Sequence, residues 1–156
     1  MSTIKVDTYQ TRGGASEIAI DKLKGVTAAG SMLVVGEGGT NTTNLQQGLT
    51  KAWFNLDAAT PALRDSFNIG SITDEGIGTY EPNFTSVMGN ANYSASGSSS
   101  TKGSTNSFTN IITTGDVANT YGLHTTASIR FNNHSQNGDA RSDPSVLQGN
   151  INGDLA

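Results

Sequence analysis

Short runs of alternating apolar and polar residues, separated by glycine-containing breaks, make up most of the chain. Near the start, Ile4 and Val6 alternate with polar neighbours, and after a break Ile18 and Ile20 alternate again. A period of two residues predicts half-buried β-strands. A third apolar run, 32–35, is bounded by glycines. Because three such short strands bury too little surface to be stable alone, we expect this segment to pack on a partner or another chain.

A short helix is expected where this arm ends. Thr43 or Asn44 can cap it, and Leu45 and Leu49 share one helix face at i, i+4 spacing. We interpret residues 1–50 as a docking arm with a connector. Its expected assembly residues are Ile4, Val6, Ile18, Ile20, Leu45 and Leu49.

Residues 51–156 carry period-two patterns at the spacing of a β-sandwich. Ala52, Phe54 and Leu56 fall on one side of the first strand. Further strands are expected over 66–70, 80–84, 92–96, 108–113, 123–131 and 146–155. The strand that contains Pro82 is expected at a sheet edge, because proline cannot donate to a ladder. The pattern thus predicts an all-β fold, an antiparallel β-sandwich preceded by an extended N-terminal β arm and a short connector helix.

Composition adds a thin core to this picture. Only 34% of the 156 residues are apolar, whereas Ser, Thr and Asn number 52 and Gly 19. A net charge of -4 is too small for disorder by composition. With no cysteine, neither disulfides nor a zinc-thiolate site can add stability. Burial against other copies of the chain is the common remedy, so we expect a homo-oligomer.

The sequence also argues against membrane insertion, nucleic-acid binding and export by a secretory signal. No apolar run is long enough to insert into a membrane. An acidic balance argues against binding nucleic acid. The first ten residues have neither the basic start nor the apolar stretch of a secretory signal, so we expect synthesis in a cytoplasm.

Residues with catalytic chemistry form no recognisable motif. His124 and His134 are the only imidazoles, and neither lies in a triad signature. Asn137, Asp139 and Asp143 could ligate calcium, but their spacing is not that of a known loop, and acids in such turns are common for backbone reasons. We therefore expect no catalytic residue, no cofactor and no metal site.

Several stretches resemble a module that recurs in structural proteins of tailed phages, notably marine and cyanobacterial ones. The central match comprises Lys-Ala-Trp at 51–53, Leu-Arg-Asp-Ser-Phe-Asn-Ile-Gly-Ser-Ile-Thr-Asp-Glu-Gly-Ile-Gly-Thr-Tyr at 63–80, Asn-Phe-Thr at 83–85 and Asn-Ala-Asn-Tyr at 90–93. Residues 2–14, 43–49 and 151–155 also resemble parts of these proteins. The serine-rich tract from Gly97 and residues 132–143 match nothing in the family. The resemblance implies a non-enzymatic virion protein, fibre-like and commonly trimeric.

Our first hypothesis is a tail fibre or fibre-like appendage of a virion. Residues 1–50 would join a homotrimer to other virion proteins of the tail or capsid, and residues 51–156 would face outward. The serine-rich tract has no apolar residue and is predicted to be a mobile loop. This loop, around 98–104, and a second one over 132–143 could contact the host surface, including a surface glycan. The candidate residues are Ser98, Ser99, Ser100, Lys102, Asn133 and Asp139.

Two other functions stay open. A capsid decoration or cement protein fits the short chain, since the arm could strap onto a shell lattice, and copy number per particle would distinguish it. A carbohydrate-binding, lectin-like module would need aromatic rings grouped for sugar stacking. Trp53, Tyr80 and Tyr93 are the candidates, although each also suits a core or strand-edge position.

Overall fold

The computed structural model describes residues 22–23, 32–100, 111–114, 124–134 and 141–156. Ten strands and one four-residue helix occupy these ranges, and every strand pair is antiparallel. The predicted all-β class is confirmed. Several residues predicted to act in docking or host contact lie outside the described residues, namely Ile4, Val6, Ile18, Ile20, Lys102 and Asp139.

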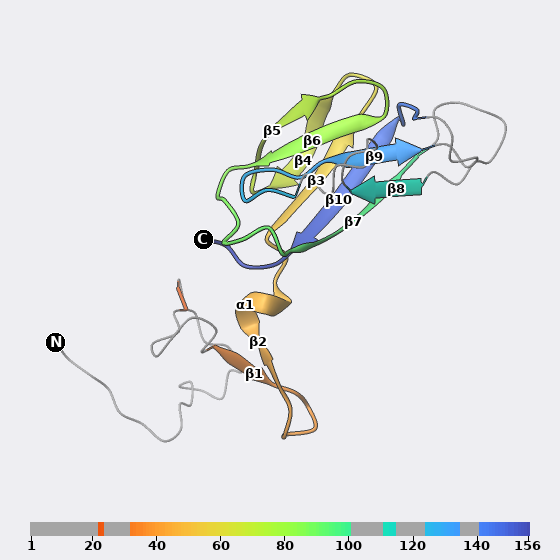
Figure 1. The fold of residues 1–156 in the computed structure, drawn as a ribbon. Coiled ribbons are helices and arrows are strands. Elements are labelled where there is room, and N and C mark those ends of the chain that lie inside the picture. The colour runs from red at the N-terminus through yellow and green to blue at the C-terminus, as the bar shows by residue number, and fades with distance from the viewer. Residues whose placement is uncertain (1–21, 24–31, 101–110, 115–123, 135–140) are drawn as a thin grey trace, which may run out of the picture.

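A small hairpin and the helix precede the larger sheets. Strand β1 (Leu33–Val35) pairs with β2 (Thr42–Asn44), and helix α1 (Leu45–Gly48) follows directly. The hairpin stands away from the remaining strands, and α1 connects the two (Figure 1).

Two four-stranded antiparallel sheets contain the other strands (Figure 1). The first sheet has the order β4 (Ala62–Phe67), β3 (Ala52–Asp57), β10 (Val146–Asn152) and β7 (Ser94–Ser99). The second sheet has the order β5 (Ile69–Asp74), β6 (Thr79–Phe84), β9 (Phe131–His134) and β8 (Ile111–Thr114).

Apolar residues of both sheets form one buried cluster. The alternation predicted for β3 is confirmed, because Ala52, Phe54 and Leu56 are buried while the residues between them are partly exposed. The ring of Phe54 meets that of Phe131 on β9 edge to face, with centroids 5.2 Å apart. The cluster comprises Ala52, Phe54, Leu56, Ala58, Ile69, Tyr80, Phe84, Met88, Tyr93, Ile129, Phe131, Leu147 and Ile151.

The chain passes from the first sheet to the second at Asn68. One strand was expected over 66–70, but β4 ends at Phe67 and β5 begins at Ile69. Asn68 has a φ of 57°, which Asn tolerates better than most residues. Its side-chain nitrogen donates to the carbonyls of Lys51 and Ser86, both at 3.0 Å. These bonds fix the turn that alternation alone does not reveal.

The edge position predicted for the proline strand is wrong, since β6 lies between β5 and β9. The Pro82 carbonyl accepts from Ile129 N at 3.2 Å. Because the nitrogen and the carbonyl of one residue in an antiparallel strand face the same neighbour, the Pro82 nitrogen, which has no hydrogen to donate, also faces the β9 side. There the ladder has only two register pairs, Thr79 with Asn132 and Tyr80 with Phe131. The sheet therefore accommodates the proline where its ladder is already interrupted.

Candidate functional site

The β1–β2 hairpin exposes apolar side chains on both of its faces. Leu33, Val34 and Val35 are 56%, 51% and 59% exposed. Because consecutive strand residues point to opposite faces, neither face of the hairpin is covered. A two-stranded hairpin is at best marginally stable alone in water. The described part of this arm therefore has the properties of a surface that another protein covers.

Helix α1 is capped as the sequence predicts, but its leucines are not paired on one face. The Asn44 side chain accepts from Gln47 N at 3.0 Å. Leu45 is the first helical residue, whereas Leu49 lies at the C-cap and is 54% exposed. The buried side chain of Lys51 folds back, so that its ammonium donates to the carbonyls of Gln46 and Leu49.

A cleft of about 600 Å³ lies between α1 and the last residues of the chain. Leu49, Phe67 and Leu155 provide its exposed apolar lining. Gln47 and Asp154 both line this cleft. The Gln47 side chain donates to the Asp154 carboxylate and so connects α1 to the segment after β10. The connector is thus attached to the first sheet through side chains as well as through the backbone.

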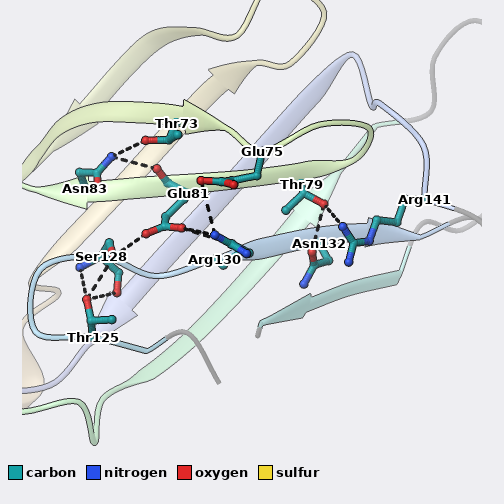
Figure 2. Close-up of polar contacts among 10 residues, drawn as sticks. All are labelled: Thr73, Glu75, Thr79, Glu81, Asn83, Thr125, Ser128, Arg130, Asn132 and Arg141. Carbon is teal, nitrogen blue, oxygen red and sulfur yellow. Dashed lines mark hydrogen bonds and ion pairs between the residues drawn. The ribbon is translucent and has the colours of Figure 1, made fainter. Parts of the chain in front are cut away.

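A polar cluster crosses the outer face of the second sheet (Figure 2). Arg130 donates to Glu81 Oε2 from Nη2 at 2.7 Å and from Nε at 3.2 Å, and its Nη2 lies 3.4 Å from Glu75 Oε1. Ser128 Oγ donates to Glu81 Oε1 at 2.7 Å. Burial acts to raise the pKa of Glu81, but the bonds from Ser128 and Arg130 and the Arg130 charge outweigh it, so this pKa lies below its usual value. The cluster joins strand β6 to the segment that enters β9.

Further polar contacts lie on both sides of the polar cluster around Glu81. At one end, Asn83 Nδ2 donates to Thr73 Oγ1 at 3.1 Å. At the other, Thr79 Oγ1 donates to Asn132 Oδ1 at 3.2 Å and accepts from Arg141 Nη1 at 2.6 Å (Figure 2). These polar groups are bonded to one another, which makes the cluster a structural support of the sheet.

Asn133 was expected in a host-facing loop, and the structure contradicts this. Asn133 lies in β9 with no exposed surface. Its Oδ1 accepts from Ser99 Oγ at 2.6 Å, and its Nδ2 donates to the Ser142 carbonyl at 2.6 Å. A buried amide needs such partners, and neither of these is a near neighbour in the sequence, since Ser99 is 34 and Ser142 nine residues away. Asn133 is therefore not available to a host molecule.

The serine tract is also partly a strand. Ser98 and Ser99 belong to β7, where Ser98 pairs with Gln148 and Ser99 with Leu147. Ser100 follows the strand, is exposed, and donates its backbone N–H to Val146 O at 2.9 Å. The ladder with β10 satisfies their backbone groups, which explains how a tract without apolar side chains extends a sheet. The mobile loop predicted from Gly97 therefore does not begin there.

The outer face of the first sheet brings two aromatic rings together. Trp53 is the register partner of Phe67 on β4 and of Asn150 on β10. Trp53 is partly exposed and Phe67 is 51% exposed. The other two rings proposed for sugar stacking are buried, because Tyr80 and Tyr93 belong to the core. Only Trp53 of the three candidates lies on an outer face, and register pairing supplies a partner that sequence reasoning missed.

The histidine and acidic residues considered for catalysis or metal binding have the following surroundings in the described part of the chain. No group of three or more His, Cys, Asp or Glu residues there could hold a metal ion. His124 stacks on Tyr93 with ring centroids 4.9 Å apart, and burial lowers its pKa. Asp143 Oδ1 accepts from Gly78 N at 2.7 Å and from the Tyr80 hydroxyl at 3.2 Å. Over the same ranges no helix has the length and apolar character to cross a membrane.

These features define an all-β protein with two antiparallel four-stranded sheets and a separate apolar hairpin. No protein-family model matches the chain. No curated protein and no solved structure is significantly similar to it.

Proposed function

We propose that this chain is a structural protein of a phage virion, a fibre-like appendage that assembles as a homotrimer through its N-terminal arm. The family resemblance of residues 51–93 supports the virion role. The observation that carries the assembly role is the hairpin, whose three apolar residues Leu33, Val34 and Val35 are all more than half exposed. Partner chains that cover them would give the hairpin the burial that the described residues of its own chain do not provide.

In this proposal the two four-stranded sheets are the layers of a β-sandwich that faces away from the particle. The shared core and the edge-to-face contact of Phe54 with Phe131 support that reading. The hairpin lies on the far side of α1 from the sheets (Figure 1). A trimer joined at the hairpins would therefore leave the outer sheet faces accessible.

Light scattering after size exclusion tests the assembly step on the full chain. We expect three times the 16.1 kDa mass of one chain at micromolar concentration. The double variant Leu33→Ser with Val35→Ser places hydroxyls on one face of the hairpin and should shift the mass towards one chain. The control Ile77→Ser changes a residue that is 67% exposed between β5 and β6, and it should keep the native mass. A native chain that runs as a stable monomer would refute the assembly step.

Immunogold electron microscopy of the purified virions tests the location. Label on the tail or its fibres supports the appendage. Dense label over the shell, at hundreds of copies, would make the chain a capsid decoration protein instead. Virions that carry no label would exclude any virion role.

A further inference from the structure

The outer face of the first sheet presents two rows of side chains in register. The first row crosses the four strands as Phe67, Trp53, Asn150 and Ser96, and the second as Asp65, Asn55, Gln148 and Ser98. With a spacing of about 4.8 Å between strands, each row is roughly 14 Å long. One end of this face is therefore aromatic, and the rest carries mainly amides and hydroxyls.

The amide end forms a shallow groove with ordered walls. Short serines on β7 stand beside longer amides on β10, and the groove over Ser96, Ser98, Gln148 and Asn150 has a volume of about 320 Å³. Ser98 Oγ donates to Gln148 Oε1 at 3.3 Å, and Asn152 Nδ2 donates to Asn150 Oδ1 at 2.9 Å. These contacts hold the two amides in place before a ligand arrives.

One buried atom on this face lowers the stability of the fold. The buried Oδ1 of Asn55 accepts no hydrogen bond from the described residues. Such an atom costs about 1–3 kcal/mol. Its neighbours in the row, Asp65 and Gln148, are also polar. A buried polar atom that lowers stability is expected where the face that carries it has a second role.

Charge restricts what the face can bind. Asp65 is the only charged residue in the two rows. Arg64, which precedes Asp65 in the chain, is paired with Asp57 at 3.0 Å. A phosphate, sulfate or carboxylate ligand would find no free cation within the rows, whereas an uncharged ligand with many hydroxyls fits them. Amides both donate and accept hydrogen bonds, as paired hydroxyls require.

We propose that this face binds an uncharged polysaccharide, which lies across the strands from Trp53 and Phe67 to the groove at Gln148 and Asn150. The apolar C–H face of a sugar ring packs on the π-face of an aromatic ring. The hydroxyls of the next rings bond to the amides and serines. The proposal rests on the proposed function, in which the outer sheet faces are accessible, and it places the host contact that the sequence suggested for loops on a sheet face.

The single tryptophan makes the binding measurable without a label. Trp53 is the only tryptophan in the chain, so a change in its fluorescence reports on this face directly. The full-length protein is titrated with the uncharged linear oligosaccharides maltohexaose, cellohexaose and xylohexaose, with a sulfated heparin hexasaccharide as the anionic comparison. We expect at least one uncharged sugar to shift the emission with a Kd below about 1 mM. The heparin fragment should have no effect.

Two variants locate the site, and one controls for surface changes. Phe67→Ser and Gln148→Ala should each weaken binding roughly tenfold, a change that corresponds to about 1.4 kcal/mol. Ile77→Ser also removes an exposed apolar side chain, but in the turn between β5 and β6, and should bind as the native protein does. Circular dichroism confirms that each variant is folded.

Three results would overturn the proposal. One is that no uncharged sugar changes the emission at about 10 mM, a concentration at which weak sites fill. Another is that the anionic fragment binds equally well. The third is that Phe67→Ser lowers the oligomer mass and leaves sugar binding unchanged, which would make this face a contact between copies of the chain. None of these results bears on virion location, which the immunogold experiment tests separately.

Discussion

The ion pair between Arg130 and Glu81 should contribute measurably to stability, and Arg130→Gln tests this. Both side chains are 18% exposed. The variant loses the guanidinium charge and both donors to Glu81 Oε2, while Ser128 still bonds to Oε1. A hydrogen bond to a charged group contributes about 1.5–3 kcal/mol, and partial access to water reduces that value. We expect the free energy of unfolding at pH 7 to fall by about 1–2 kcal/mol.

The pH dependence follows from the lowered pKa of Glu81. A carboxyl whose pKa is lower in the folded state adds stability above its ordinary value, here 4.5, and loses it as the pH falls through the folded pKa. In the Arg130→Gln variant the hydrogen bonds and the charge of Arg130 no longer lower this pKa, while the bond from Ser128 and the effect of burial remain. The difference in stability between native protein and variant should therefore be constant from pH 7 to about pH 5 and shrink towards pH 3.

Urea denaturation at fixed protein concentration, followed by Trp53 fluorescence, measures both quantities. Arg64→Gln is the control, because Arg64 also pairs with a carboxylate, that of Asp57 at 3.0 Å, but the two side chains are 47% and 31% exposed. Water screens such a pair, so this variant should lose much less stability than Arg130→Gln. Equal losses in the two variants, or a loss in Arg130→Gln that stays constant down to pH 3, would refute the reasoning.

Two further predictions concern the first sheet. In Gly149→Ala, the new Cβ would lie 2.7 Å from Phe54 Cζ and 3.0 Å from Phe131 Cζ. Urea denaturation should therefore show that the free energy of unfolding falls by about 2–3 kcal/mol, in the upper part of the range for overpacked cores. Gly38→Ala, whose new Cβ meets no atom within 4 Å, is the control, and equal stability of the two variants would contradict the packing. Asn55→Leu removes a buried oxygen that has no hydrogen-bond partner among the described residues. Thermal denaturation should therefore show a stability equal to that of the native protein or higher by up to about 1 kcal/mol, while sugar binding falls. A clear loss of stability would mean that Asn55 has a structural role.

Local patterns in the sequence predicted elements that depend on near neighbours. The alternation of Ala52, Phe54 and Leu56 gave the buried face of β3, and Asn44 was one of two residues expected to cap the helix. Both features are determined within a few residues, by the period of a strand and by a side chain that reaches the next turn. The strand at 32–35 was found for the same reason.

Features that depend on distant partners were missed. The sequence predicted a loop at Asn133, because nothing nearby in the chain indicates that this amide is buried. Its burial depends on hydrogen bonds with Ser99 and Ser142, which only the fold brings to it. Pro82 is tolerated inside the second sheet because the ladder with β9 is short at that point. The pairing of Trp53 with Phe67 depends on the register of β3 and β4, and a bulge between Asn55 and Leu56 shifts that register where no simple count of residues reveals it.

The place of β3 in its sheet determines how the molecule would respond to a pulling force. The connector enters β3 at Ala52, and β3 is held along its length by six register pairs with β10 and five with β4. A pull on the hairpin along the strand axis would shear both ladders at once, so many hydrogen bonds would have to break together before the strand slipped. Strands β5 and β7, at the sheet edges, each have one neighbour and could be peeled away bond by bond. The chain is thus joined to its arm through a mechanically resistant strand.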